Sequence, residues 1–253
     1  NNSVAYTDAA ETGAFMREWL SLYESKSGER GMFNRQAAEK QAAKNGRREE
    51  YADFGTNPCS EIILRNKQFC NLTEVVVRSD DTMNTLINKV ENATILGTLQ
   101  ATLTNFRYLT SKWKHNTQEE SLLGVSLTGI MDNKDMINGN IDLEYLKNIS
   151  VSINKVWAKK LGIPTSAAIT CVKPSGTVSQ LVDSASGIHT RHSPYYLRTI
   201  RADKKDPLAR LMVDAGVYHE DDVTKPEHTY VFYFPIKSPK GSLTRKDFTA
   251  IEH

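Results

Sequence analysis

Two cysteines, eleven positions apart, lie among side chains that can carry out radical or redox chemistry. Cys59 stands in Asn57-Pro58-Cys59-Ser60-Glu61-Ile62, and Cys70 stands in Phe69-Cys70-Asn71-Leu72. A thiol can act as a nucleophile or carry a hydrogen atom, and a carboxylate can act as a general base. An amide can orient hydroxyl groups by hydrogen bonding. These residue types together predict a site that acts on one small ligand.

The spacing of Asn57, Cys59 and Glu61 suggests how these groups would meet. In an extended chain, residues two positions apart point to the same side, so the three side chains would share one face. Pro58 fixes the backbone before Cys59, which we expect at the start of a strand or on a tight loop. A free cysteine is more often a small buried apolar residue. The polar neighbours and the second thiol at Cys70 favour a functional site over that interpretation.

A second candidate site follows the short apolar segment 167–172, which is predicted to be a strand. The next residues, Lys173-Pro174-Ser175-Gly176-Thr177, form a small glycine-containing turn that leads into a helix start. Free backbone N–H groups and hydroxyl donors in such a turn can bind a phosphate. By itself this pattern favours an ordinary turn and helix cap over a phosphate site.

The remaining cysteine and the paired histidines are assigned structural positions. Cys171 lies in the apolar segment before the turn, and we interpret it as a buried structural thiol. His189 and His192 have the spacing of a helical metal pair, but Gly187 and Pro194 disfavour a helix there. We therefore expect a loop at the rim of the site and no metal centre.

The elements that position these residues alternate between helices and strands, which predicts an α/β layer or barrel. The apolar periodicity predicts helices over 11–25, 35–48, about 82–106, 119–130, 143–161 and 207–215, and a helix opening over 244–252. Runs of β-branched and aromatic residues predict strands over 60–64, 72–77, 167–172, 195–201 and 230–234.

Composition excludes several classes of function. Thirty-two basic residues against 30 acidic ones leave a net charge of +2, whereas nucleic-acid-binding domains usually carry a large basic excess. The basic end of the predicted 35–48 helix, with Lys44, Arg47 and Arg48, is interpreted as surface charge. No apolar run reaches the ~20 residues of a membrane span, and no secretory signal is visible. Three cysteines fit a reducing compartment, so we expect a cytoplasmic protein.

The two cysteine motifs resemble the active-site strand and loop of ribonucleotide reductases. The Asn-Pro-Cys form and the eleven-residue step from Cys59 to Cys70 are similar to the adenosylcobalamin-dependent (class II) enzymes, particularly the monomeric ribonucleoside-triphosphate reductases. The resemblance runs from Ser27 to at least Arg198. It covers most of this chain but only the middle of a family member, so both ends of 1–253 are expected to be truncated within one catalytic barrel domain.

The resemblance implies a role for each residue of the cysteine motifs. Cys59 would be the thiyl radical that removes the ribose 3′ hydrogen, and Glu61 the base that takes the 3′-hydroxyl proton. Asn57 would bind the substrate hydroxyls. Cys70 would be half of the redox dithiol, with its partner thiol outside this chain, since no cysteine precedes Cys59.

The resemblance also implies the fold, the ligands and the partners. It points to a segment of a ten-stranded α/β barrel and to adenosylcobalamin as cofactor. The substrate would be a ribonucleoside triphosphate or diphosphate, and thioredoxin or another dithiol would be the reductant. The substrate phosphates would be bound by the turn that contains Pro174, Ser175, Gly176 and Thr177.

Two alternatives remain open at this point. The first is a reductase of another radical class, which the Pro58 form and the cysteine spacing disfavour. The second is a non-catalytic, nucleotide-binding fragment of a split reductase that needs a complementary chain. The absent partner thiol makes the second alternative a serious one.

Overall fold

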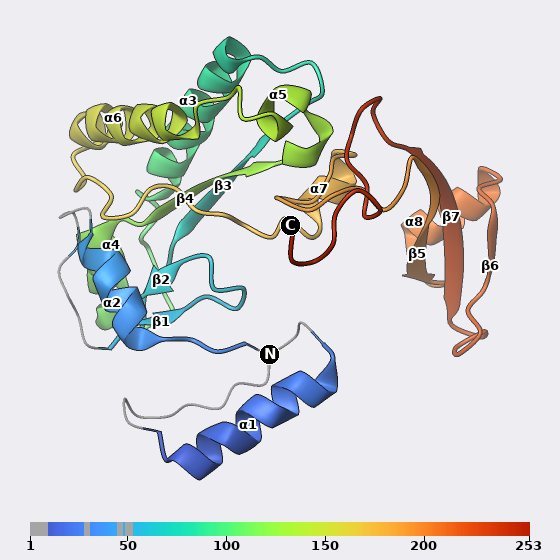
Figure 1. The fold of residues 1–253 in the computed structure, drawn as a ribbon, viewed down its shortest axis with the longest axis horizontal. Coiled ribbons are helices and arrows are strands. Elements are labelled where there is room, and N and C mark those ends of the chain that lie inside the picture. The colour runs from blue at the N-terminus through green and yellow to red at the C-terminus, as the bar shows by residue number, and fades with distance from the viewer. Residues whose placement is uncertain (1–9, 28–30, 45–47, 49–52) are drawn as a thin grey trace.

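The computed structural model describes residues 10–27, 31–44, 48 and 53–253, and its elements alternate between helices and strands (Figure 1). The helices are α1 (Thr12–Ser25), α2 (Arg35–Ala43), α3 (Met83–Gln100), α4 (Ser111–Glu120), α5 (Lys134–Ile137), α6 (Leu143–Leu161), α7 (Val178–Leu181), α8 (Pro207–Asp214) and the 3-10 turn η1 (Ile130–Asp132). The strands are β1 (Gly55–Thr56), β2 (Ile63–Leu64), β3 (Asn71–Val76), β4 (Leu123–Thr128), β5 (Tyr195–Asp203), β6 (His219–Asp221) and β7 (Thr229–Lys237). The predicted α/β class is confirmed.

Parallel pairing of β3 with β4 forms the centre of the molecule. The register runs from Asn71 opposite Leu123 to Val76 opposite Thr128. Segment 167–172, predicted as a strand, runs beside the other edge of β4 and is extended, but it forms only one isolated parallel bridge, between Val125 and Thr170. Three adjacent parallel segments are consistent with part of a larger α/β barrel.

Helices cover one face of this sheet (Figure 1). Val75 and Val125 of the strands pack in one buried cluster with Leu86 and Val90 of α3 and Leu146 of α6. α3 approaches closely at Gly97, where an added Cβ would lie 3.4 Å from a Leu123 methyl group. The odd-numbered residues of β3 and β4 thus face the helices, and the even-numbered residues face the opposite side.

The long helix predicted after Asp81-Thr82 is confirmed, and its start is well defined. The Thr82 side chain accepts a hydrogen bond from the Thr85 N–H, and the Thr85 side chain accepts one from the Thr82 N–H. This reciprocal pair satisfies backbone donors that the first turn leaves free. The helix ends at Gln100, before the predicted residue 106.

A buried ion pair ties the β1–β2 hairpin to α4. The Arg48 guanidinium donates to both carboxylate oxygens of Glu120, each at 2.9 Å, and to the Ile63 carbonyl at 2.8 Å. Gln68 also donates to Glu120. We call Arg48, Gln68 and Glu120 the clamp. The prediction that Arg48 belongs to a surface charge cluster is therefore wrong, because its guanidinium balances a buried carboxylate.

The C-terminal part of the chain forms a separate antiparallel sheet with strand order β5-β7-β6 (Figure 1). Strands over 195–201 and 230–234 and a helix over 207–215 were predicted there, and all three are confirmed. The buried Arg191 connects this part to the centre, since it donates to Asp132 at 2.8 Å and its N–H bonds the Leu243 carbonyl.

The predicted helix over 119–130 is wrong. α4 ends at Glu120, and the apolar run that follows is β4, which is buried on both sides between the helices and the hairpin. A strand buried on both faces has no alternating polar pattern, so its apolar run cannot be told from a buried helix by periodicity.

Four further expectations differ from the structure. Segment 244–252 consists of a bridge residue and turns rather than a helix opening, and only Ile63–Leu64 of the predicted strand 60–64 is extended. The apolar side of α1 was predicted to face inward, but α1 has no buried residue among those described, and Trp19 stacks on Tyr23. The helix predicted over 35–48 is shorter, because α2 ends at Ala43. Residues 45–47, near its predicted end, lie outside the described residues.

We predict that the clamp contributes strongly to stability. Replacing Arg48 with Met leaves the buried Glu120 carboxylate without its main partner, which should lower the free energy of unfolding by about 3 kcal/mol. Urea unfolding followed by circular dichroism measures this loss. The matched control is Lys204→Met, which removes a solvent-accessible ion pair with Asp221 and should cost much less than the loss of the clamp. Equal costs for the two variants would contradict the assignment.

Candidate active site

The hairpin formed by β1 and β2 carries the first cysteine motif at its tip. The Ser60 N–H donates to the Asn57 carbonyl at 3.0 Å, and the Asn57 N–H donates to the Ile62 carbonyl at 3.3 Å. Cys59 lies at this turn and is exposed. The predicted tight loop is therefore confirmed, and the thiol is open to a reagent that approaches the tip.

The tip is not an extended strand, so the predicted alternation of three side chains on one face is wrong. Ser60 has a φ of 64°, in the left-handed region, which reverses the chain between Cys59 and Glu61. The Asn57 side-chain oxygen accepts a hydrogen bond from the Ile62 N–H at 3.0 Å, so it closes the turn. The Asn57 amide N–H groups have no partner in this contact and remain the donors that Asn57 can offer a ligand.

The hairpin packs against the face of the β3–β4 pair that lies opposite α3 and α6, and we call it the hairpin-side face. It carries Leu72 and Glu74 of β3 opposite Gly124 and Ser126 of β4. Gly124 has no side chain, and an added Cβ there would lie 3.0 Å from both the Cys171 sulfur and an Ile62 methyl group. The glycine thus lets the hairpin and the segment that contains Cys171 pack directly against the sheet.

Three titratable groups, Glu61, Cys70 and Cys171, interact electrostatically at this face. Burial raises the pKa of the Cys70 thiol, and the negative charge of Glu61 adds to this shift. Burial raises the pKa of Cys171 to about 12, with further contributions from Glu61 and Cys70. Both thiols are therefore protonated near neutral pH. Glu61 Oε2 is buried, and it has no hydrogen-bond partner among the described residues.

Lys173 joins the hairpin-side face through an ion pair. Its Nζ lies 2.8 Å from Glu74 Oε2, and its backbone N–H donates to the Ser126 hydroxyl at 2.9 Å. The Glu74 side chain is 7% exposed, and its second oxygen, Oε1, is buried without a hydrogen-bond partner among the described residues. Two carboxylates of this site, Glu61 and Glu74, therefore each present a free acceptor.

The candidate phosphate turn is held by its own backbone and by the segment that follows. Ser175 is fully buried, and its side chain accepts a hydrogen bond from the Ser179 N–H at 3.1 Å. Its carbonyl accepts from the Ser186 hydroxyl. Pro174, Gly176 and Thr177 are exposed, and Thr177 is the N-terminal cap of α7 with no side-chain cap hydrogen bond. Three of the four predicted residues are thus open to a ligand. The fourth, Ser175, is buried and stabilises the turn through its hydrogen bonds.

The structure brings Glu61, Cys70 and Cys171 within electrostatic range of one another, and it connects the turn to the same face through Lys173. Sequence reasoning missed Glu74, Ser126 and Gly124. For Glu74 a signal was present, because Cys70, Leu72 and Glu74 are spaced two apart and so share a strand face. For Ser126 and Gly124 no signal was available once residues 119–130 were assigned to a helix.

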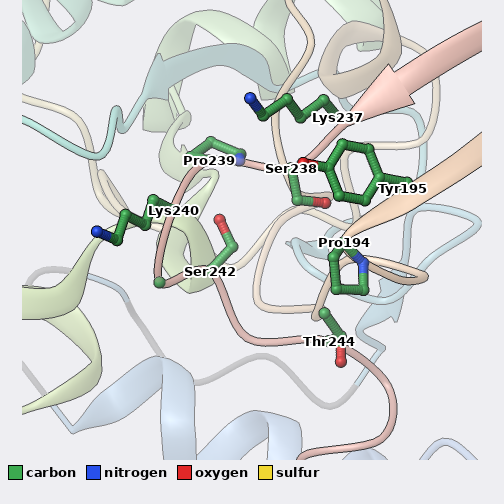
Figure 2. A pocket seen from close by; sticks show the side chains of 9 residues that line it. Pro194, Tyr195, Lys237, Ser238, Pro239, Lys240, Ser242 and Thr244 are labelled. Carbon is green, nitrogen blue, oxygen red and sulfur yellow. The ribbon is translucent and has the colours of Figure 1, made fainter.

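Other features lie outside this arrangement. His189 is in a loop as predicted, and the described residues contain no group of three metal-ligating side chains. The pocket in Figure 2 lies between the ends of β5 and β7 and residues 239–244, and none of the predicted site residues lines it. Over the described parts of the chain, no helix is both long and apolar enough to cross a membrane.

Comparison with known proteins identifies similar sequences in one group of enzymes, although no protein-family model matches the chain. An adenosylcobalamin-dependent ribonucleoside-triphosphate reductase of Lactobacillus gasseri is 29% identical over 212 residues, which cover 73% of this chain and 28% of that protein. The Euglena gracilis enzyme of the same name is 27% identical over 205 residues, covering 79% of this chain and 27% of that protein. The chain thus spans less than a third of the length of these curated relatives.

A solved structure shows the same relationship. The crystal structure of a B12-dependent (class II) ribonucleotide reductase matches with a TM-score of 0.57 and 25% identity, over 75% of this chain and 30% of that one. The resemblance inferred from the residues around Cys59 and Cys70 is therefore confirmed, and so is the α/β fold. The comparisons do not favour another radical class or a non-catalytic fragment.

We predict that the three thiols react with a maleimide in a fixed order. The exposed Cys59 should react first and Cys171 last, because Cys171 is half-buried and its pKa lies near 12. Mass spectrometry of quenched samples measures each rate, with urea-unfolded protein as the control. Raising the pH should speed the reaction of Cys171 progressively, since its thiolate fraction grows. Labelling of Cys171 as fast as Cys59 in the folded protein would contradict the assigned burial.

We also predict that Gly124 tolerates no side chain. In Gly124→Ala the new Cβ would lie 2.4 Å from a Leu72 methyl group, so the hairpin or the strand must shift. The variant should lose about 1–3 kcal/mol in the free energy of unfolding. Gly55→Ala is the matched control, since no atom lies within 4 Å of its added Cβ. Similar stabilities for the two variants in urea unfolding would show that the hairpin does not pack closely on β4.

Proposed function

We propose that the chain is the central catalytic segment of an adenosylcobalamin-dependent ribonucleoside-triphosphate reductase. The reaction replaces the ribose 2′-hydroxyl with hydrogen to make deoxyribonucleotides for DNA synthesis. The observation that carries the proposal is the exposed Cys59 thiol at the tip of the hairpin that also carries Glu61, whose charge acts on the Cys70 thiol. The similarity to reductases of this kind supports it.

The proposed chemistry begins at Cys59. Adenosylcobalamin, when bound, would supply the radical chemistry that activates the Cys59 thiol. No described residue is assigned to hold the cofactor, and the exposed tip fits a thiol that an external radical generator must reach. The Cys59 thiyl radical then takes the 3′ hydrogen atom of the ribose. This step forms the S–H bond and leaves a carbon radical on the sugar.

Glu61 and Asn57 act on the sugar hydroxyls in this proposal. Glu61 Oε2, which lacks a protein partner among the described residues, accepts the 3′-hydroxyl proton. The Asn57 amide donates hydrogen bonds to the sugar hydroxyls while its oxygen closes the turn. The 2′-hydroxyl takes up one of the two protons of the redox dithiol and leaves as water, which generates the sugar radical that the dithiol must reduce.

Cys70 supplies one half of that reduction. It and a partner thiol together give two electrons and two protons, and they end as a disulfide. The raised pKa of Cys70 supports this role, because a protonated thiol can give a hydrogen atom directly. The 3′ hydrogen returns from Cys59, which regenerates the thiyl radical. A dithiol such as thioredoxin reduces the disulfide for the next turnover.

The turn of Pro174, Ser175, Gly176 and Thr177 binds the substrate phosphates in this proposal. The free N–H groups before α7 and the Thr177 hydroxyl are available donors, since Thr177 makes no cap hydrogen bond. A ribonucleoside triphosphate is favoured over a diphosphate by the names of the relatives. Residues 1–253 are then part of one catalytic barrel domain that acts in the cytoplasm.

We predict that Cys59→Ser abolishes nucleotide reduction, because a hydroxyl hydrogen is too strongly bound to replace the thiol. The measurement is deoxyribonucleotide formation from a ribonucleoside triphosphate with adenosylcobalamin and dithiothreitol. Lys204→Met, on the distant antiparallel sheet, is the control and should keep full activity. Retained activity in Cys59→Ser would overturn the proposed function. Activity only after a complementary chain is added would instead favour the split-enzyme alternative.

A further inference from the structure

We propose that Glu74 is a positioning residue that sets the phosphate-binding turn through its ion pair with Lys173. The inference rests on the proposed function and deepens it. It assigns Lys173 to Glu74 rather than to the substrate phosphates. It also connects two parts of the site that are 99 positions apart in sequence.

The first argument is the geometry of the contact. Lys173 Nζ and Glu74 Oε2 are 2.8 Å apart, a charge-assisted hydrogen bond, and the Glu74 side chain is more than nine-tenths buried. A carboxylate in such a place would be costly to leave ionised without a partner. The lysine ammonium is therefore committed to Glu74 and is not a free cation at the turn.

The second argument is the row of contacts that crosses the three parallel segments. Glu74 of β3 is in register with Ser126 of β4, and the Ser126 hydroxyl accepts the Lys173 backbone N–H at 2.9 Å. Lys173 is thus held at its backbone by β4 and at its ammonium by β3. Pro174 to Thr177 begin directly after this doubly held residue. Their backbone donors are consequently fixed relative to the strand that follows Cys70.

The third argument comes from two buried carboxylate oxygens of the site. Glu74 Oε1 and Glu61 Oε2 are both buried, and neither has a hydrogen-bond partner among the described residues. Glu61 and the Lys173–Glu74 pair lie near the same thiol, because the charge of Glu61 raises the pKa of Cys171 and that of Lys173 lowers it. A substrate whose hydroxyl groups donate hydrogen bonds matches these acceptors. Glu74 therefore holds the turn with one oxygen and leaves the other oxygen to the site.

The test separates positioning from a merely structural role by comparing ligands with and without phosphates. Calorimetry on the chain would measure the dissociation constants of ATP and adenosine for the unsubstituted protein, Glu74→Gln and Lys173→Met. We expect each variant to bind ATP about tenfold more weakly, the size expected for a lost hydrogen bond to a charged group. Adenosine affinity should change by less than about threefold, since adenosine lacks the phosphates that the turn binds.

Two further variants test whether Glu74 affects ATP binding through its ion pair with Lys173. The double variant Glu74→Gln/Lys173→Met should bind ATP no more weakly than Lys173→Met, because residues that act through one contact are not additive. Lys173→Arg keeps the ion pair and should stay within about threefold of the unsubstituted protein. Thermal unfolding identifies any variant that does not fold. If Glu74→Gln fails to fold, Lys173→Met carries the comparison, because Lys173 is the more exposed partner.

The possible results are distinguishable. Unchanged or tighter ATP binding by Glu74→Gln would overturn the inference, because it would show that Lys173, once released, binds phosphate itself. An equal loss for ATP and adenosine would also overturn it, since that is the result of a structural role alone. If the unsubstituted chain bound neither ligand, the proposed function would fail together with the inference. Lys204→Met, which breaks a comparable lysine–carboxylate pair elsewhere, should bind both ligands normally.

Discussion

The parallel pairing of β3 with β4 is the constraint on which the rest of the structure depends. Its six-residue register gives the two strands a common alternation, so one face of the pair is apolar and the other carries Glu74, Ser126 and Gly124. The apolar face is buried by α3 and α6. The other face needs a partner that balances the charge of Glu74. The cysteine hairpin packs there through Ile62, and Lys173, which follows the segment beside β4, forms an ion pair with Glu74.

The hairpin can occupy this position because of two local features. Gly124 leaves room for Ile62 and for the Cys171 sulfur, which a side chain at that point would displace. The clamp of Arg48, Gln68 and Glu120 fixes the base of the hairpin by bonding the Ile63 carbonyl and the residues around it. The hairpin tip that carries Cys59 is thus attached to a base held by a buried ion pair. Rigid support of this kind is what a precisely placed functional group requires.

Much of the local structure could be predicted from the sequence, and the failures have identifiable physical causes. The capped helix from Thr82 and the helix ended by Gly162 were predictable, because caps and periodicity are local signals. β4 was not, because a strand buried on both faces loses the alternation that identifies strands. The burial of Arg48 was not predictable either, since its partner Glu120 lies 72 positions away. The cysteine motifs indicated the site, but the turn at Ser60 and the contact of Lys173 with Glu74 depend on tertiary pairing that no local pattern encodes.

The central claim is that Cys59 carries the radical, and electron paramagnetic resonance tests it most directly. The chain would be labelled with β-deuterated cysteine, mixed with adenosylcobalamin and a ribonucleoside triphosphate, and frozen within milliseconds. The account predicts a thiyl signal that deuteration narrows, that Cys59→Ser removes, and that Cys171→Ser retains. A signal of unchanged shape and intensity in Cys59→Ser would contradict the account, because the radical would then reside on another residue.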